Sequence, residues 1–379
     1  MPVTSTSLAV AVELDGTGAH PASWRFGDVA PSDVPSVVDL VRRVERAGFT
    51  IATFADPTTR AGHPTIRGRL DPVEVAAFAA AVTEVIGLVP AVGAVHAEPF
   101  HLANQLASAD FASHGRTGWI AETADSAART AAYGVPQVTG PDGLRRENDE
   151  VIAAVRRLWD TWEDGVFVAD PDTGHFLDPH RLHYADFDGD LFSVKGPSIT
   201  PRPPQGQLVV FAPFDVAGYP AAVSPDLVDV HLVDGPTTAE IAARAEAAHR
   251  ASGSREHRVL AEIEVLFDTE HERATQRLAE LDTHSPWPLT DRLRYTGSVD
   301  GLLTVLTDVI GGVDGVRLHP AVLATDLPIL ERDILPELRR QRRLVVPQPA
   351  SSLRRTLGLT RPANVFAAAR AAGGRHSAS

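Results

Sequence analysis

Cysteine is absent from this chain, and lysine is nearly absent. Without cysteine the protein cannot form disulfide bonds, thiolate zinc sites, cysteine-ligated iron–sulfur clusters or a cysteine nucleophile. Lys195 is the single lysine among 35 basic residues. Its surroundings, Ser193-Val194-Lys195-Gly196-Pro197, are not those of a phosphate-binding loop. P-loop ATPase and Schiff-base chemistry therefore find no support in the sequence.

Positive charge and long apolar runs are also scarce. The 35 basic residues face 49 acidic ones, a net charge of −14, which argues against a nucleic-acid-binding protein. The most apolar stretch, residues 76–95, is interrupted by Glu84, Gly87 and Pro90, so we expect no membrane span of ~18–20 residues. The first residues lack the basic and apolar regions of a secretory signal. We therefore expect a cytoplasmic protein that does not contact a membrane.

The chain does contain a regular alternation of short β-branched runs with helix-like segments, and 44% of its 379 residues are hydrophobic. Such alternation is typical of βα units around a parallel sheet. The predicted strands are residues 7–14, 50–56, 87–95, 117–122, 208–214, 227–233, 258–267 and 313–319. Helix-forming sequence follows each of them, and Asp71-Pro72 is a typical start for the second helix. Eight units predict an α/β fold, a (β/α)8 TIM barrel.

An open, doubly wound sheet could also hold eight strands, but its first turn would normally carry three spaced glycines. Only Gly16 and Gly18 are present here. We expect one barrel domain over residues 1–372. The Asp-, Gly-, Pro- and His-rich stretch 164–206 is predicted to be an insertion on the barrel rim, with a hairpin around Phe192-Ser193-Val194. Residues 373–379 are predicted to be a flexible tail.

Two stretches carry a family resemblance. The first is residues 70–103, with Glu98-Pro99-Phe100-His101, and the second is residues 107–119, ending in Gly115-Arg116-Thr117-Gly118-Trp119. Together they resemble the bacterial luciferase-like flavin monooxygenases, in particular the branch of nitrilotriacetate, EDTA and dibenzothiophene-sulfone monooxygenases. Shorter matches to that branch lie at residues 20–25, 158–162, 191–197 and 357–362.

This resemblance implies a two-component oxygenase with a barrel fold. Reduced FMN, supplied by a separate flavin reductase, would meet O2 and a small organic substrate at the carboxyl ends of the strands. The resemblance also implies a homodimer and no metal ion. The protein would bind and orient the reactants and exclude water from them.

The resemblance also suggests cofactor-binding residues. Asp56, at the end of the second predicted strand, matches an acidic position near the flavin ring, although it could instead cap a helix. His96 follows the third strand and would face the barrel mouth. Trp119 and Thr123 belong to the fourth strand or directly follow it; packing in the core and ending the strand are their alternative roles. Arg145 could pair with the flavin phosphate or be solvated at a helix start. No catalytic residue is predicted.

The expected phosphate-binding turn departs from the family pattern. Asp215 stands where the family has a serine, and Pro213 removes an amide donor. A carboxylate ~4 Å from a phosphate is repelled by roughly 1 kcal/mol even in water. The chain therefore binds FMN through other groups, uses another flavin or a deazaflavin, or has lost flavin binding. In the last case it would be a paralogue that acts as a binding or partner subunit.

Overall fold

The computed structural model describes residues 7–14, 16–26, 34–55, 70–123, 130–131, 133–138, 140–214 and 223–376. Asp56 and Asp215 lie outside these described residues. Among the described residues, no helix is long and apolar enough to cross a membrane.

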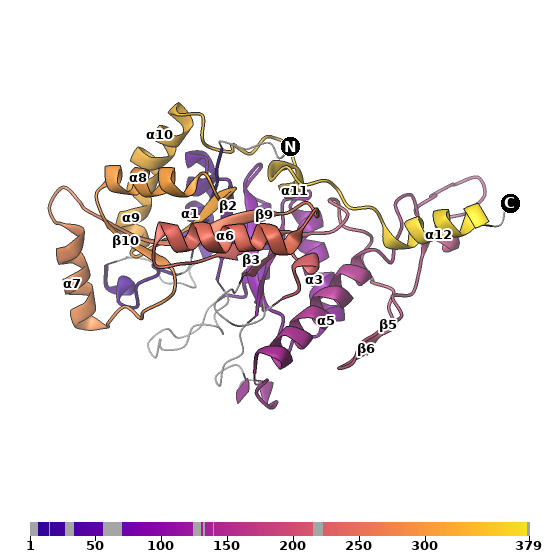
Figure 1. The fold of residues 1–379 in the computed structure, drawn as a ribbon. Helices are drawn as coiled ribbons and strands as arrows, with labels where there is room; N and C mark the ends of the chain where they lie inside the picture. The colour runs from indigo at the N-terminus through magenta and orange to yellow at the C-terminus, as the bar shows by residue number, and fades with distance from the viewer. Residues whose placement is uncertain are drawn as a thin grey trace.

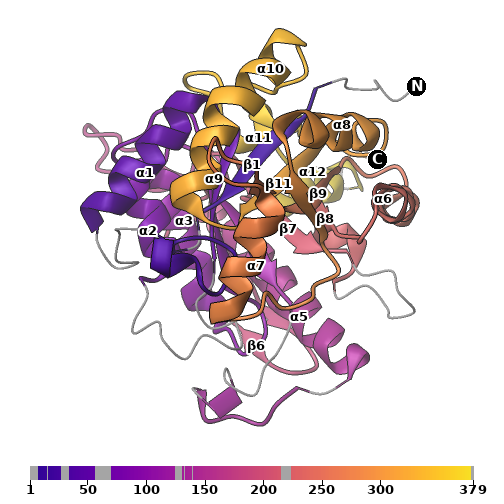
Figure 2. The ribbon, with the colours of Figure 1, turned by 90° about the vertical axis from the view of Figure 1, so that its left-hand side faces the viewer.

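Eight parallel strands close into a barrel, which confirms the predicted fold (Figure 2). In ring order the strands are β1 (Ala9–Glu13), β2 (Ile51–Phe54), β3 (Gly87–Gly93), β4 (Gly118–Glu122), β7 (Val209–Pro213), β8 (Val230–Val233), β9 (Arg258–Phe267) and β11 (Gly315–Pro320). Pairing of β8 with β9, from Val230 opposite Arg258 onward, closes the ring. A closed ring leaves no free sheet edge between these strands.

A ninth strand, β10 (Leu293–Gly297), was not predicted from the sequence. It pairs in parallel with the carboxyl half of β9, whereas β8 pairs with the amino half of β9. The segment was missed because it has no run of β-branched residues and carries arginine in alternation with apolar side chains. As a result, β10 rather than β8 lies beside β9 at the carboxyl end of that strand.

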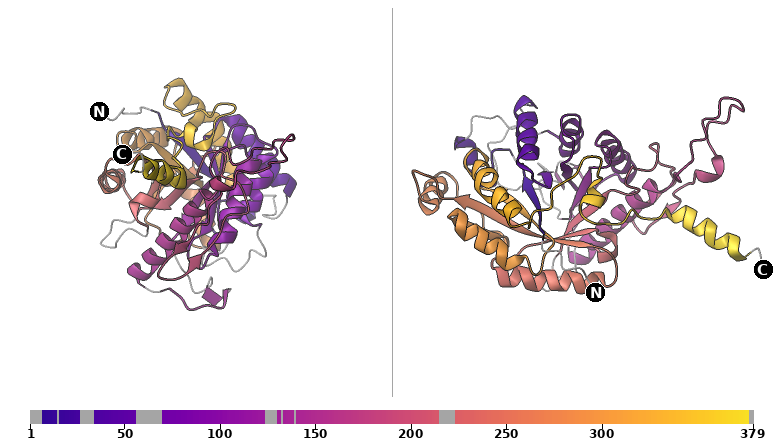
Figure 3. Two further views of the ribbon diagram at one scale, coloured as in Figure 1. Left: turned by 90° about the vertical axis from the view of Figure 1, so that its right-hand side faces the viewer. Right: turned by 90° about the horizontal axis from the view of Figure 1, so that it is seen from above.

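Helices surround the strands (Figure 3). They are α1 (Val34–Ala47), α2 (Pro72–Ala80), α3 (Pro99–Ala112), α5 (Pro141–Trp159), α6 (Thr238–Ser252), α7 (Ala274–His284), α8 (Val299–Val309), α9 (Leu323–Ile329), α10 (Leu335–Arg340), α11 (Leu353–Thr356) and α12 (Val365–His376). A π-helical turn, η4 (Leu330–Ile334), joins α9 to α10. The predicted start of α2 is confirmed, because the Asp71 carboxylate accepts hydrogen bonds from the Val73 and Glu74 amides.

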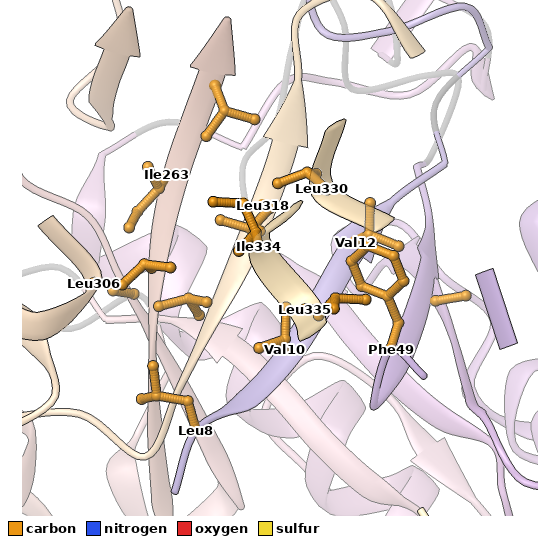
Figure 4. Close-up of a cluster of buried hydrophobic side chains, with 14 of the residues drawn as sticks. Leu8, Val10, Val12, Phe49, Ile263, Leu306, Leu318, Leu330, Ile334 and Leu335 are labelled. Carbon is orange, nitrogen blue, oxygen red and sulfur yellow. The ribbon is translucent and has the colours of Figure 1, made fainter. Parts of the chain in front are cut away.

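The core has an outer and an inner part. Outside the barrel, alternate side chains of the strands pack against the helices; Val10 and Leu318, for example, lie near Leu335 (Figure 4). Inside the barrel, small and branched residues form an apolar filling. Its members are Ala9, Ala11, Ile51, Val89, Ala91, Ile120, Val209, Phe211, Val230, Leu232 and Leu260, with Leu353, Leu357 and Leu359 from the segment of α11.

The predicted rim hairpin is present as β5 (Phe187–Asp188) paired antiparallel with β6 (Ser193–Val194). Short 3-10 turns, η1 (Ser23–Phe26), η2 (Pro179–Arg181) and η3 (Pro225–Leu227), lie in connecting segments. The hairpin and α12 extend from the same side of the barrel (Figure 1). Helix α12 runs to His376, so it includes the first part of the segment predicted as a flexible tail.

Candidate functional site

A layer of charged side chains lies above the apolar filling, toward the carboxyl ends of the strands. Glu13 continues the inward positions of Ala9 and Ala11 in β1, because alternate residues of a strand share a face. The same alternation turns the other members of the layer inward. They are Thr53 on β2, Glu262 and Glu264 on β9, and Arg317 and His319 on β11; all are buried. Active sites of TIM barrels form at this end of the barrel.

Arg317 is the centre of the layer. Its Nη1 donates to Glu262 Oε1 at 2.6 Å, its Nε donates to Thr53 Oγ1 at 3.1 Å, and its Nη2 contacts Glu13. The Thr53 hydroxyl donates to Glu13 Oε2 at 2.7 Å. These contacts tie β1, β2, β9 and β11 together and pair charges that burial alone would make costly.

Two more arginines come from this part of the chain: Arg292, directly before β10, and Arg294, within it. Arg292 Nε donates to Glu262 Oε2 at 2.7 Å, and Arg294 Nε donates to Glu264 Oε2 at 2.7 Å. Arg294 also lies over the Trp287 ring, 4.0 Å from its centroid, and donates to the Pro288 carbonyl oxygen. The missed segment therefore contributes a large part of the charge at this end of the barrel.

The electrostatics fix the protonation states of the layer. Burial acts to raise the pKa of Glu13, but Arg317 and His319 outweigh burial and hold this pKa below its ordinary value. Arg292 and Arg317 likewise hold the pKa of Glu262 well below its ordinary value against the effect of burial. Burial, assisted by Arg292, lowers the pKa of His319 to about 4. At neutral pH the two glutamates are therefore ionised and His319 is neutral.

Two polar atoms of the layer are buried without a hydrogen-bond partner among the described residues: Glu13 Oε1 and His319 Nε2. The nearest charged oxygen to His319 Nε2 is Glu262 Oε1, at 3.6 Å. Buried polar atoms are nearly always paired with protein, water or ligand. The two atoms therefore make this layer a candidate place for a polar molecule to bind.

A cavity of about 530 Å³ at the opposite end of the barrel, lined by His249, His257 and Arg258, is a weaker candidate. All three nitrogens of the Arg258 guanidinium donate to carbonyl oxygens, those of Leu357, His257 and Gly358. Such an arginine has a structural role. No group of three or more potential metal ligands occurs among the described residues.

Four of the predicted residues are described, and they lie on or after β3 and β4 and on α5, none of which supplies a member of this layer. His96 lies in a turn after β3 with a positive φ of 64°, and its backbone amide donates to Glu147 Oε1 at 2.6 Å. Trp119 faces outward from β4 into the core between the barrel and its helices, where its Nε1 donates to the Val92 carbonyl oxygen. This position favours its alternative role in core packing.

Thr123 and Arg145 lie near α5. The Thr123 carbonyl oxygen accepts a hydrogen bond from Asn148, and its side chain is largely buried after β4. The Arg145 side chain is 47% exposed, with its Nε 3.8 Å from an Asp149 oxygen one turn along the helix. Arg145 is thus the most accessible of the predicted residues that the structure describes.

Sequence reasoning missed the charged layer, although a signal was present. Glu262 and Glu264 alternate with apolar residues inside a strand that is otherwise buried, and so do Arg317 and His319. In a strand covered on both faces, a run of apolar residues is expected. Charge at alternate positions of such a strand therefore points to a polar interior.

The polar atoms of the layer can be compared with those of a flavin ring. The pyrimidine edge of an isoalloxazine carries both hydrogen-bond donors and acceptors, and Glu13 Oε1 and His319 Nε2 offer unpartnered atoms for such a group. The layer therefore fits the polar edge of a flavin ring. For the phosphate, the described part of the expected turn is Ala212, Pro213 and Phe214, and Pro213 is the last residue of β7.

A closed (β/α)8 barrel with a polar layer at its carboxyl end defines a TIM-barrel enzyme. Residues 17–299 match the model of the luciferase-like monooxygenase family, and the chain belongs to this family. The resemblance drawn from its motifs is thereby confirmed.

Among curated relatives, the chain is 34% identical over 209 residues to N-acetyl-S-(2-succino)cysteine monooxygenase of Bacillus subtilis (strain 168), covering 54% of this chain and 47% of that protein. It is 37% identical over 141 residues to dibenzothiophene-sulfone monooxygenase of Rhodococcus erythropolis, covering 37% and 31%. The chain thus spans about half the length of the curated relatives it matches, or less.

Solved structures share the fold over nearly the whole chain. A riboflavin lyase superposes with a TM-score of 0.80 at 21% identity, covering 96% of this chain and 99% of that one. EDTA monooxygenase from Chelativorans sp. BNC1 superposes with a TM-score of 0.76 at 20% identity, covering 94% and 99%. At these identities the likeness establishes the fold.

Proposed function

We propose that this protein is a flavin-dependent monooxygenase that oxidises a small organic substrate. Reduced FMN from a separate flavin reductase, together with O2, is the expected oxidising system. The observation that carries the proposal is the charged layer, in which two buried atoms have no partner among the described residues, at the functional end of a barrel of this family. Relatives are named for nitrilotriacetate and for dibenzothiophene sulfone, so the family leaves the substrate open.

Bound reduced flavin would supply the chemistry that activates O2. The chain's own residues bind and orient the reactants. Arg317 holds Glu13 and Glu262 in place, and the neutral imidazole of His319 is available to donate to or accept from a polar group at Nε2. Dense packing below the layer excludes water from that side of the site.

The phosphate end of the cofactor is proposed to lie toward the start of α5. Arg145 is exposed there and carries a planar guanidinium suited to phosphate. Asp56, His96 and Thr123 remain proposed contacts of the ring or of the loops around it, whereas Trp119 packs in the core outside the barrel. A deazaflavin is the alternative cofactor, and a cytoplasmic location belongs to the same proposal.

Titration of the purified protein with FMN, reduced FMN and a deazaflavin tests the proposal. We expect a saturable thermal shift and a fluorescence change with reduced FMN, and substrate-dependent O2 consumption once a flavin reductase is added. Replacing His319 by Asn should weaken the binding of reduced FMN, whereas Arg250→Gln on the surface of α6 should not. Absence of any response to all three flavins would contradict the proposal.

We also propose that the protein forms a homodimer through α2 and α3. Apart from Glu74, every residue of α2 is apolar, so the face turned away from the barrel is apolar too. Phe78 on α2 is 50% exposed and Phe111 on the neighbouring α3 is 41% exposed. Aromatic side chains on such a face favour a protein interface over solvent.

Light scattering on the wild-type protein and on Phe78→Glu tests the homodimer. We expect a dimer that the variant converts to monomer, because the charge would be buried without a partner. Phe176→Glu, in the rim insertion, is the matched control, since Phe176 is equally aromatic and 63% exposed. A monomeric wild type, or equal effects of both variants, would argue against this interface.

A further inference from the structure

Arg292, directly before β10, and Arg294, within it, both face the barrel side. Leu293 and Tyr295 pack against the outer core, so the alternate residues Arg292 and Arg294 face the other way. This orientation agrees with their hydrogen bonds to Glu262 and Glu264. The two arginines therefore belong to the same layer as the proposed site.

The acidic and basic side chains of these ion pairs differ in their exposure to solvent. The side chains of Glu262 and Glu264 are only 9% and 2% exposed, whereas those of Arg292 and Arg294 are 29% and 21% exposed. The negative groups are thus covered and the positive groups reach solvent. On a chain with a net charge of −14, these two ion pairs thus present their positive member to solvent.

The arginines of the layer differ in how many donors they use. All three nitrogens of Arg317 are bonded within the layer. Arg294 is held by Glu264, by the Pro288 carbonyl oxygen and by the Trp287 ring. Arg292 donates only from Nε, to Glu262; its Nη1 and Nη2 have no partner among the described residues. They are also not among the buried unpartnered atoms, so solvent reaches them.

We propose that Arg292 binds an anionic group of the substrate, a carboxylate or a similar oxyanion, and thereby selects negatively charged substrates; this rests on the proposed function. The Nη pair of a guanidinium matches a planar carboxylate with two parallel hydrogen bonds. Glu262 fixes the guanidinium through Nε, which reduces the side-chain entropy lost on binding. An uncharged substrate of the same shape would form weaker bonds with this group.

Succinate, with its uncharged diamide as the matched control, is a suitable probe, and binding is measured by calorimetry on the full chain. We expect saturable binding of succinate, weak or absent binding of the diamide, and a loss of about 10- to 100-fold in succinate affinity in Arg292→Gln, the range of a lost charged hydrogen-bond pair. Arg292→Lys keeps the positive charge but lacks the paired donors, so its affinity for succinate should lie between those of the wild type and Arg292→Gln. Arg250→Gln, which removes a surface arginine paired with Glu246, should bind succinate normally.

Binding of reduced FMN, measured in the same variants, separates this proposal from the proposed function. Thermal denaturation of Arg292→Gln shows whether the variant is folded, so that a loss of succinate binding is not mistaken for unfolding. If the wild-type protein fails to bind succinate, binds the diamide equally well, or loses nothing in Arg292→Gln, Arg292 is not the anion-binding group. If succinate binds as expected but no flavin does, the proposed cofactor is wrong and the anion site stands.

Discussion

Burial changes the ionisation of a single carboxyl group, that of Asp110. Asp110 on α3 is fully buried; its Oδ1 accepts from Gln205 Nε2 at 2.7 Å and from the Thr117 amide at 3.3 Å, and its Oδ2 has no partner among the described residues. Burial raises the pKa of Asp110 to about 7. The native state therefore favours the protonated carboxyl, whereas the unfolded chain ionises near its ordinary value.

The sign of the resulting pH dependence follows from this difference. As pH rises from about 4 to about 7, the unfolded chain releases a proton that the native protein retains, so the free energy of unfolding falls by about 1.4 kcal/mol per pH unit from this group. Asp110→Asn cannot ionise. We therefore expect the difference in unfolding free energy between the variant and the wild type to grow in favour of the variant from about pH 4 to about pH 7 and to stay constant at higher pH. Urea denaturation at pH 5, 6, 7 and 8 measures the gain; a constant difference would exclude the titration. Asp172→Asn, at an exposed position, is the control.

Arg317 gives a second prediction at the residue scale. Replacing it by Met leaves Glu13 and Glu262 buried with too few partners, which should cost about 3–5 kcal/mol of unfolding free energy. The double variant Glu13→Gln, Arg317→Met removes one of the stranded charges, so it should be more stable than Arg317→Met alone. Chemical denaturation of the four proteins in this cycle gives the coupling energy. Additive effects would mean that the pair does not act as a unit.

At the scale of elements, the segment after β1 is held by a buried histidine. The His20 ring accepts from the Ala22 amide at Nδ1 and donates from Nε2 to Asp282 at 3.1 Å, and Trp287 packs edge-on at 5.1 Å. These contacts tie the first connecting segment to α7 and to the segment before β10. Residues 20–25, one of the shorter matches to the family, therefore connect elements that border the proposed site.

His20→Ala should cost about 2 kcal/mol of stability, because it leaves the Ala22 amide without its acceptor and opens a gap beside Trp287. Faster amide hydrogen exchange at residues 19–23 would show that the effect is local. Asp282→Asn keeps an acceptor for His20 Nε2 and is expected to change exchange there much less. Unchanged amide hydrogen exchange at residues 19–23 in His20→Ala would show that His20 does not hold this segment in place.

At the scale of the whole molecule, the closed barrel has two ends of opposite character. The charged layer lies at the carboxyl end, and the segment of α11 closes the amino end with Leu353, Leu357 and Leu359. Leu353 lies so close to the strands that a Cβ at Gly87 or Gly118 would come within 3 Å of its side chain. The C-terminal part of the chain thus packs at the amino end of the barrel against β3 and β4, which belong to its N-terminal half.

Leu353→Ala should therefore destabilise the protein by about 2–5 kcal/mol, as expected for a buried leucine in a tightly packed site. Leu289→Ala is the control, because Leu289 is almost wholly exposed. Thermal denaturation compares the two. A loss in Leu353→Ala no larger than that in Leu289→Ala would show that α11 does not support the barrel.

The sequence by itself determined the repeating unit and the family of this protein. Alternation of β-branched runs with helix-forming segments is a local property, and local patterns such as the Asp71-Pro72 helix start survive in the structure unchanged. The motifs of residues 70–119 pointed to luciferase-like monooxygenases for the same reason: they are short and contiguous.

Only the tertiary structure decided where the charged groups meet. Glu13 and Arg317 are 304 residues apart in the chain and become neighbours because the first and last strands of the ring pair. Strand β10 forms by pairing with the carboxyl half of β9, and the residues of β10 alone do not indicate this pairing. Closure of a barrel is a long-range event that brings alternate residues of distant strands to one interior, and no local pattern records which of them will touch.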